Sequence, residues 1–105
     1  MGLDTLRARD RSLALFERYG ALLTEHQREV VDLYLRHDWS LAEIAQHEGT
    51  SRAAVHDIVR RSGHALEGYE RRLGLLAESA RRRRALEALA KELTGVKRRL
   101  ARMEG

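Results

Sequence analysis

The stretch SLAEIAQHEGTSRAAVHDIVRRS, Ser40–Ser62, decides the fold of this chain. Ser40 and Glu43 form the Ser-x-x-Glu pattern of a capping box, in which each side chain bonds a free backbone amide at the start of a helix. Gly49 can adopt the left-handed conformation that ends a helix, and Ser51 can cap the helix that follows. The stretch therefore predicts two helices joined by a short turn.

Two helices joined by so short a turn must cross steeply, and this crossing constrains three positions. Ala45 must be small where the two backbones approach, Gly49 must turn the chain, and Val55 must fill the angle between the helices. The sequence meets all three requirements. It therefore predicts a helix-turn-helix motif over residues 40–62.

The outer face of the second helix supplies the candidate residues for binding nucleic acid. With Val55 turned inward, a period of 100° per residue predicts this face to carry Ala53, His56, Asp57, Arg60, Arg61 and His64. In a DNA-binding module these positions lie in the major groove. The predicted contact residues are Arg52, Ala53, His56, Arg60 and Arg61. The alternative is an ordinary solvated helix face, and Asp57 would repel phosphate unless it pairs with Arg60 or Arg61.

Composition predicts an all-α protein with one compact domain. The chain has 105 residues, no proline, 5% aromatic residues and 34% charged residues, which suits amphipathic helices better than a sheet. The absence of cysteine excludes disulfides and thiolate metal sites. No apolar run is long enough to span a membrane, and residues 1–6 lack the features of a signal peptide, so we expect a cytoplasmic protein.

The sequence offers no catalytic, cofactor or metal site. There is no glycine-rich phosphate loop and no nucleophile beside a base. His56 and His64 lie two helical turns apart, too far for a shared metal ion. We therefore expect no enzymatic activity, no cofactor and no bound metal.

The residues before the motif predict two supporting helices. A broad apolar face predicts a first helix over residues 3–19, which Gly20 ends. Thr24 and Gln27 form a second capping box and open the next helix. Its predicted core residues are Val30, Val31, Tyr34 and Leu35.

The residues after the motif predict a long helix and then a second apolar seam. The stripe of the recognition helix continues through Leu66, Tyr69, Leu73 and Leu76 and predicts that this helix extends to about Ala80, with a kink at one of its glycines. The seam that follows is Leu86, Leu89, Leu93, Val96, Leu100 and Met103. Because the two runs are out of phase, we expect a break or bend at Arg81–Arg84. The predicted organisation is a helix-turn-helix domain over residues 1–80 and a basic C-terminal helix over residues 81–105.

The seam and the charge distribution suggest two contact surfaces. We expect a symmetric dimer through Leu73, Leu76, Leu89 and Leu93; the alternative is that the last helix folds back on its own domain. The net charge is +4, but residues 24–62 carry −2 and residues 81–105 carry +6. The predicted binding site for an anionic partner is Arg81, Arg82, Arg83 and Arg84, and RNA, the DNA backbone or an acidic protein could occupy it. The alternative is that these arginines only keep a helix bend solvated.

Four blocks of the chain form a recognisable set, LTEHQR at 23–28, SLAEIA at 40–45, SRAAVHD at 51–57 and LEGYERRLGL at 66–75. Through these blocks the run from Phe16 to Leu75 resembles the YlxM family of small bacterial helix-turn-helix proteins. The first blocks also occur in region 4 of bacterial sigma factors, and the last block is specific to the family. The resemblance implies an all-helical dimer whose gene lies beside those of the signal recognition particle GTPases and which regulates that pathway.

Two functions remain open from the sequence. The first is a non-enzymatic regulatory protein that contacts the signal recognition particle RNA or its GTPases. The second is a sequence-specific DNA-binding transcriptional regulator. The acidic motif favours the first, whereas the intact turn at Ala45, Gly49 and Val55 favours the second.

Overall fold

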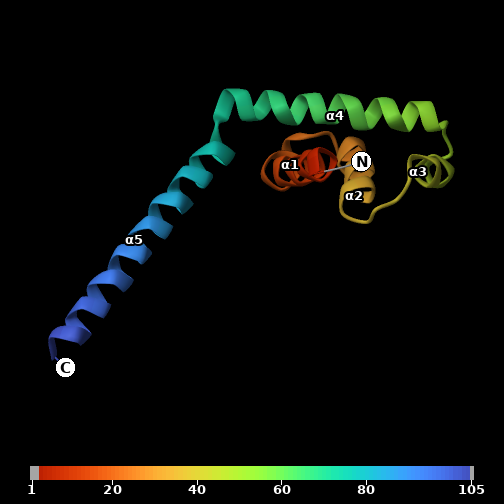
Figure 1. The fold of residues 1–105 in the computed structure, drawn as a ribbon. Coiled ribbons are helices and arrows are strands. Elements are labelled where there is room, and N and C mark those ends of the chain that lie inside the picture. Colours follow the sequence, from red (N-terminus) through yellow and green to blue (C-terminus); the bar gives the residue numbers. More distant parts are fainter. Residues whose placement is uncertain (1–2, 105) are drawn as a thin grey trace. The chain divides into compact units, whose positions relative to one another are not determined.

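The computed structural model describes the backbone of residues 3–104 and the side chains of residues 8–104. Within these residues every regular element is a helix, as predicted from composition (Figure 1). Its elements are α1 (Leu3–Tyr19), the short 3-10 helix η1 (Gly20–Leu22), α2 (Glu25–Leu35), α3 (Leu41–Glu48), α4 (Arg52–Leu73) and α5 (Leu75–Glu104). The chain divides into two compact units, which we call the core unit (residues up to Gly74) and the α5 unit (residues from Leu75).

The core unit is built around α4. Helices α1, α2 and α3 all pack against it, as Figure 1 shows. Val30, Ile44, Ala45 and Val55 form one buried cluster, and Trp39 packs against it from the link before α3. Helix α1 adds a second set of buried side chains, Leu15, Phe16 and Tyr19. The apolar faces of α1, α2 and α3 therefore enclose one face of α4.

Both predicted capping boxes are present. The Ser40 hydroxyl accepts a hydrogen bond from the Glu43 amide at 3.1 Å, and the Glu43 carboxylate accepts one from the Ser40 amide at 2.9 Å. These bonds lower the pKa of Glu43, the hydrogen bond from the Ser40 backbone contributing most. Thr24 and Gln27 make the same pair of bonds at the start of α2. The sequence therefore predicted the first residue of each of these helices correctly.

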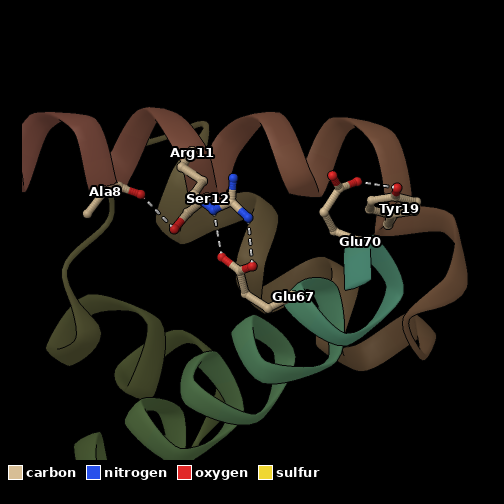
Figure 2. A network of polar contacts seen from close by, with 6 residues as sticks. All are labelled: Ala8, Arg11, Ser12, Tyr19, Glu67 and Glu70. Atoms are coloured by element: carbon tan, nitrogen blue, oxygen red, sulfur yellow. Dashed lines mark hydrogen bonds and ion pairs between the residues drawn. The ribbon is translucent and has the colours of Figure 1, made fainter. Parts of the chain in front are cut away.

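Polar contacts join α1 to the second half of α4 (Figure 2). Arg11 donates two hydrogen bonds to the Glu67 carboxylate, at 2.8 and 2.9 Å, and the Tyr19 hydroxyl lies 2.6 Å from the Glu70 carboxylate. The Tyr69 hydroxyl donates to the Leu22 carbonyl at 3.4 Å. These contacts hold the part of α4 that lies beyond the helix-turn-helix motif.

The structure corrects the predicted end of the recognition helix. Helix α4 stops at Leu73, because Gly74 adopts the left-handed conformation with φ 62° and ψ 19°. The prediction that this helix reaches Ala80 is wrong, and so is the break at Arg81–Arg84, since α5 runs through these residues without interruption. A new helix that starts at Leu75 need not keep the phase of α4. The phase change in the sequence therefore arises at Gly74.

Candidate nucleic-acid interface

The turn between α3 and α4 has the geometry that the motif requires. Gly49 lies in the left-handed region with φ 69° and ψ 37°, and the Thr50 amide donates to the Ala45 carbonyl at 3.0 Å. The Ser51 hydroxyl caps α4 by accepting from the Ala54 amide at 3.0 Å. Ala45 and Val55 are both buried, at 6% and 0% exposure. The motif over residues 40–62 is therefore confirmed as a helix-turn-helix.

The predicted contact residues all lie on the solvent side of α4. Their side chains are exposed in every case, and they are Arg52, Ala53, His56, Arg60 and Arg61. Arg52 forms no ion pair within the described part of the chain. The structure thus places the predicted residues on an accessible face of the recognition helix, and whether they bind nucleic acid stays a prediction.

Asp57 neutralises part of this face. One carboxylate oxygen accepts a hydrogen bond from Arg60 Nη2 at 2.7 Å, and the other lies 2.9 Å from Arg61 Nε. The hydrogen bond from Arg60 contributes most to lowering the pKa of Asp57 below its ordinary value. Two of the three candidate arginines are therefore paired within the helix and are less available to phosphate.

A groove of about 310 Å³ lies between α1, α2 and α4, beside the candidate face. Its apolar lining includes Leu15, Val31, Leu35, Val59 and Leu66, and Arg60 and His64 also line it. Arg60 therefore lies between the outer face and this groove. The sequence did not predict the groove, because it depends on how three helices pack rather than on any one of them.

The second candidate site, Arg81–Arg84, lies on α5. All four arginines are exposed. Arg82 lies 3.0 Å from the Glu78 carboxylate one turn earlier, whereas Arg81, Arg83 and Arg84 form no ion pair among residues 8–104. The α5 unit therefore presents unpaired positive charge to solvent.

The residues predicted to form a dimer are accessible within their own units. Leu73 at the end of α4 is 53% exposed, and on α5 Leu89 and Leu93 are 56% and 63% exposed, while Leu76 is half-buried. The rest of the seam is exposed as well, from 40% at Val96 to 81% at Met103. We call Leu86, Leu89, Leu93, Val96, Leu100 and Met103 the apolar seam. Dimerisation through it stays a prediction.

The described residues hold no cluster suited to a metal ion. No group of three or more His, Asp or Glu side chains among them has the required proximity. No helix in this part of the chain is long and apolar enough to cross a membrane.

Comparison with known proteins agrees with the resemblance found in the motifs. Residues 6–104 match the family described as "Putative helix-turn-helix protein, YlxM / p13 like". A UPF0122 protein of Symbiobacterium thermophilum is 53% identical over 79 residues, which cover 75% of this chain and 74% of that protein.

Two further relatives carry the same family designation. One from Clostridium kluyveri is 51% identical over 73 residues, 70% of this chain and 66% of its own length. One from Streptococcus gordonii is 43% identical over 83 residues, 79% of this chain and 76% of its own length. The family is described as one of helix-turn-helix proteins, which supports a regulatory or nucleic-acid-binding role. The chain belongs to the YlxM / p13-like UPF0122 family.

Proposed function

We propose that this protein is a non-enzymatic regulator that contacts its partner through α5, and that the partner is the signal recognition particle RNA or one of its GTPases. The observation that carries the proposal is the distribution of charge. The core unit has eleven basic and twelve acidic side chains, whereas the α5 unit has nine basic and four acidic ones. The net attraction to an anionic partner therefore comes from the α5 unit and not from the core unit as a whole.

The contacts of Asp57 support the same assignment. A DNA-reading helix gains most of its affinity from free lysine and arginine side chains that neutralise phosphates. Here Arg60 and Arg61 already share one carboxylate, and Arg52 is the unpaired arginine among the three candidates. The helix-turn-helix then serves as a scaffold for α5. The link to the signal recognition particle comes from the resemblance to the YlxM family.

The test is a set of binding titrations with the full chain. The probes are particle RNA, each purified GTPase and duplex DNA, each at two salt concentrations. One variant replaces Arg52, Arg60 and Arg61 by Gln, and the other replaces Arg81, Arg83 and Arg84 by Gln, so that both lose three charges. We expect the α5 variant to lose affinity for RNA or a GTPase, and the α4 variant to bind nearly as the parent does.

Sequence-specific DNA binding is the second candidate function. It is favoured by the intact turn, in which Ala45, Gly49 and Val55 have the burial and the backbone conformation of a reading motif. In that case the α4 variant loses DNA affinity and the α5 variant keeps most of it. Tight binding of one DNA sequence, with no affinity for the particle RNA or the GTPases, would replace the first proposal by this one.

We also propose that the protein is a homodimer. The apolar seam keeps its spacing of three and four residues over nearly three heptads and lies exposed within the α5 unit. An exposed seam of this kind is typical of a helix that packs against another helix. A second copy of α5 offers an identical seam, and a symmetric pair would enclose both.

A further inference from the structure

Helix α5 carries a line of cations on the side away from its apolar seam. Arg84, Lys91 and Arg98 recur every seven residues, and Arg102 follows one turn later. At 100° per residue these four positions lie nearly opposite the centre of the seam. All four side chains are exposed, and none has an ion pair or hydrogen bond within residues 8–104. We call Arg84, Lys91, Arg98 and Arg102 the basic stripe.

The middle of the basic stripe borders a shallow surface depression. Ala90, Thr94 and Gly95 line this depression on α5 together with Lys91 and Arg98. A side chain at Gly95 would meet nothing within 4 Å, so no contact in the described chain requires a glycine there. Glycine in the middle of a helix costs stability and is favoured where a ligand approaches the backbone closely.

Together these features point to an extended anion. The stripe is about 27 Å long at 1.5 Å per residue, which matches a polymer with regularly spaced charges better than a single anionic group. An anionic membrane fits less well once the apolar seams are packed together in the proposed dimer, because no apolar face of α5 is then left to insert into the lipid. Packing of two seams in a dimer would leave both stripes exposed to solvent.

The side chains of α5 favour a double-helical nucleic acid bound by its backbone. Residues 75–104 contain no aromatic side chain on which single-stranded bases could stack, and no Asn or Gln to read adenine. Duplex RNA is recognised mainly by its shape and backbone. We propose that the basic stripe binds the phosphate backbone of an RNA helix, which lies closest to α5 over Gly95. This inference rests on the proposed function and assigns the face of α5 that carries it.

A matched pair of full-chain variants tests the stripe. Lys91→Gln with Arg98→Gln removes the two cations beside Gly95. Lys97→Gln with Arg99→Gln removes one lysine and one arginine from the same turns but off the stripe. We expect the first variant to flatten the slope of log K against log salt for an RNA duplex by about 1.5, and the second to change it by less than about 0.5. An equal change of slope in the two variants would show that RNA is attracted by the overall charge of α5 and not by the stripe, and would overturn the inference.

The depression at Gly95 is tested by a second pair of variants, for which both helix content and RNA affinity are measured. Gly95→Leu fills the depression between Lys91 and Arg98, and Ala101→Leu adds a leucine at another exposed position of α5 as a control. We expect the Gly95 variant to be at least as helical by circular dichroism and yet to bind RNA more weakly. The Ala101 variant should bind as the parent does. RNA binding by the Gly95 variant equal to that of the parent would overturn the placement of the backbone.

The probes identify the partner. They are an RNA duplex of about 20 base pairs, longer than the stripe, a DNA duplex of the same sequence, the particle RNA and the purified GTPases. The inference requires that RNA bind more tightly than DNA. Tighter binding to the DNA duplex than to the RNA duplex would overturn it. So would stripe variants that lose affinity for a GTPase but not for RNA. If the parent binds neither the particle RNA nor a GTPase, the proposed function fails. If the parent binds RNA and the Lys91 and Arg98 variant binds it equally well, this inference alone is contradicted.

Discussion

Asp57 determines how much positive charge the recognition helix presents. Its carboxylate pairs with Arg60 at 2.7 Å and with Arg61 at 2.9 Å. Both arginines lie on α4, three and four residues after Asp57. The sequence placed this acid on the outer face and anticipated that it could pair with one of these arginines. The structure shows that it pairs with both. Asp57, Arg60 and Arg61 together therefore carry a net charge of +1, half of what the two arginines alone would present.

Replacing Asp57 by Asn tests this account of the charge. Because the change frees two arginines, we expect the affinity for duplex DNA at low salt to rise and the slope of log K against log salt to steepen by up to about two. Asp10→Asn, at an exposed position of α1, makes the same change in net charge away from α4 and serves as the control. Similar slopes for the two variants would mean that Asp57 does not limit binding to phosphate.

The ion pair of Arg11 and Glu67 makes stability depend on pH. The hydrogen bond from Arg11 is the main cause that lowers the pKa of Glu67 from its ordinary value of 4.5. A lowered folded-state pKa means that the pair stabilises the protein fully above about pH 4.5, and that this contribution is lost as the pH falls through the folded pKa. The Glu67 side chain is 39% exposed, so we expect the contribution to be below about 1 kcal/mol.

Urea unfolding of the parent and of Glu67→Gln between pH 7 and pH 3 measures this contribution. The difference in the free energy of unfolding should be constant at neutral pH and shrink towards zero in acid. Arg11→Gln should give the same profile, and the double variant should lose little more than either single variant, because both changes break one interaction. A difference that stays constant down to pH 3 would rule out the Glu67 ionisation as its source.

Two residues show why the core could be predicted only in part. The broad apolar face predicted over residues 3–19 did not single out Leu15, which is only 2% exposed. One face of α1 meets α2 and another meets α4, so its apolar sector is wider than a single stripe. Ser62 is fully buried, and its hydroxyl has no hydrogen-bond partner among residues 8–104. Hydrophobic spacing gives no signal for such a position.

The helix starts were predictable because each is encoded by neighbouring residues. The caps at Thr24, Ser40 and Ser51 each depend on side chains within three positions of the helix start. The end of α4 was harder, since Gly63, Gly68 and Gly74 are equally plausible places for a kink. Gly63 and Gly68 remain helical because α4 packs against α1 and α2 along this part, and Gly74 follows its last turn. Packing therefore selects among the glycines.

A pair of glycine substitutions tests the break after α4. Gly74 has a φ of 62°, a conformation that L-residues adopt at a cost, so Gly74→Ala should lower the free energy of unfolding of the core unit by about 1 kcal/mol. Gly63 is helical and a side chain there meets nothing within 4 Å, so Gly63→Ala should raise it by about 1 kcal/mol. Urea titration at one pH measures both. Stabilisation by both substitutions would mean that α4 continues past Gly74 in solution.

For the whole molecule, the proposed dimer depends on the apolar seam. Leu93→Lys places a charge in the seam, and Ala88→Lys places the same charge on an exposed position of α5 outside it. We expect the first variant to sediment as one subunit and the second to sediment as the parent dimer, since burying an unpaired ammonium opposes association. Leu73→Lys tests in the same way whether the end of α4 takes part. A parent that sediments as a monomer would show that no dimer forms through the seam.

The central claim is that α5, and not the helix-turn-helix, binds the anionic partner. The most direct measurement compares the affinity of the full chain for particle RNA with that of a chain ending at Gly74, the last residue of the core unit. Thermal melting followed by circular dichroism shows whether the shorter chain is folded, and sedimentation gives the mass of each chain. The account predicts that the folded shorter chain loses RNA binding, because nine basic side chains are removed. Undiminished RNA affinity in the shorter chain would contradict it.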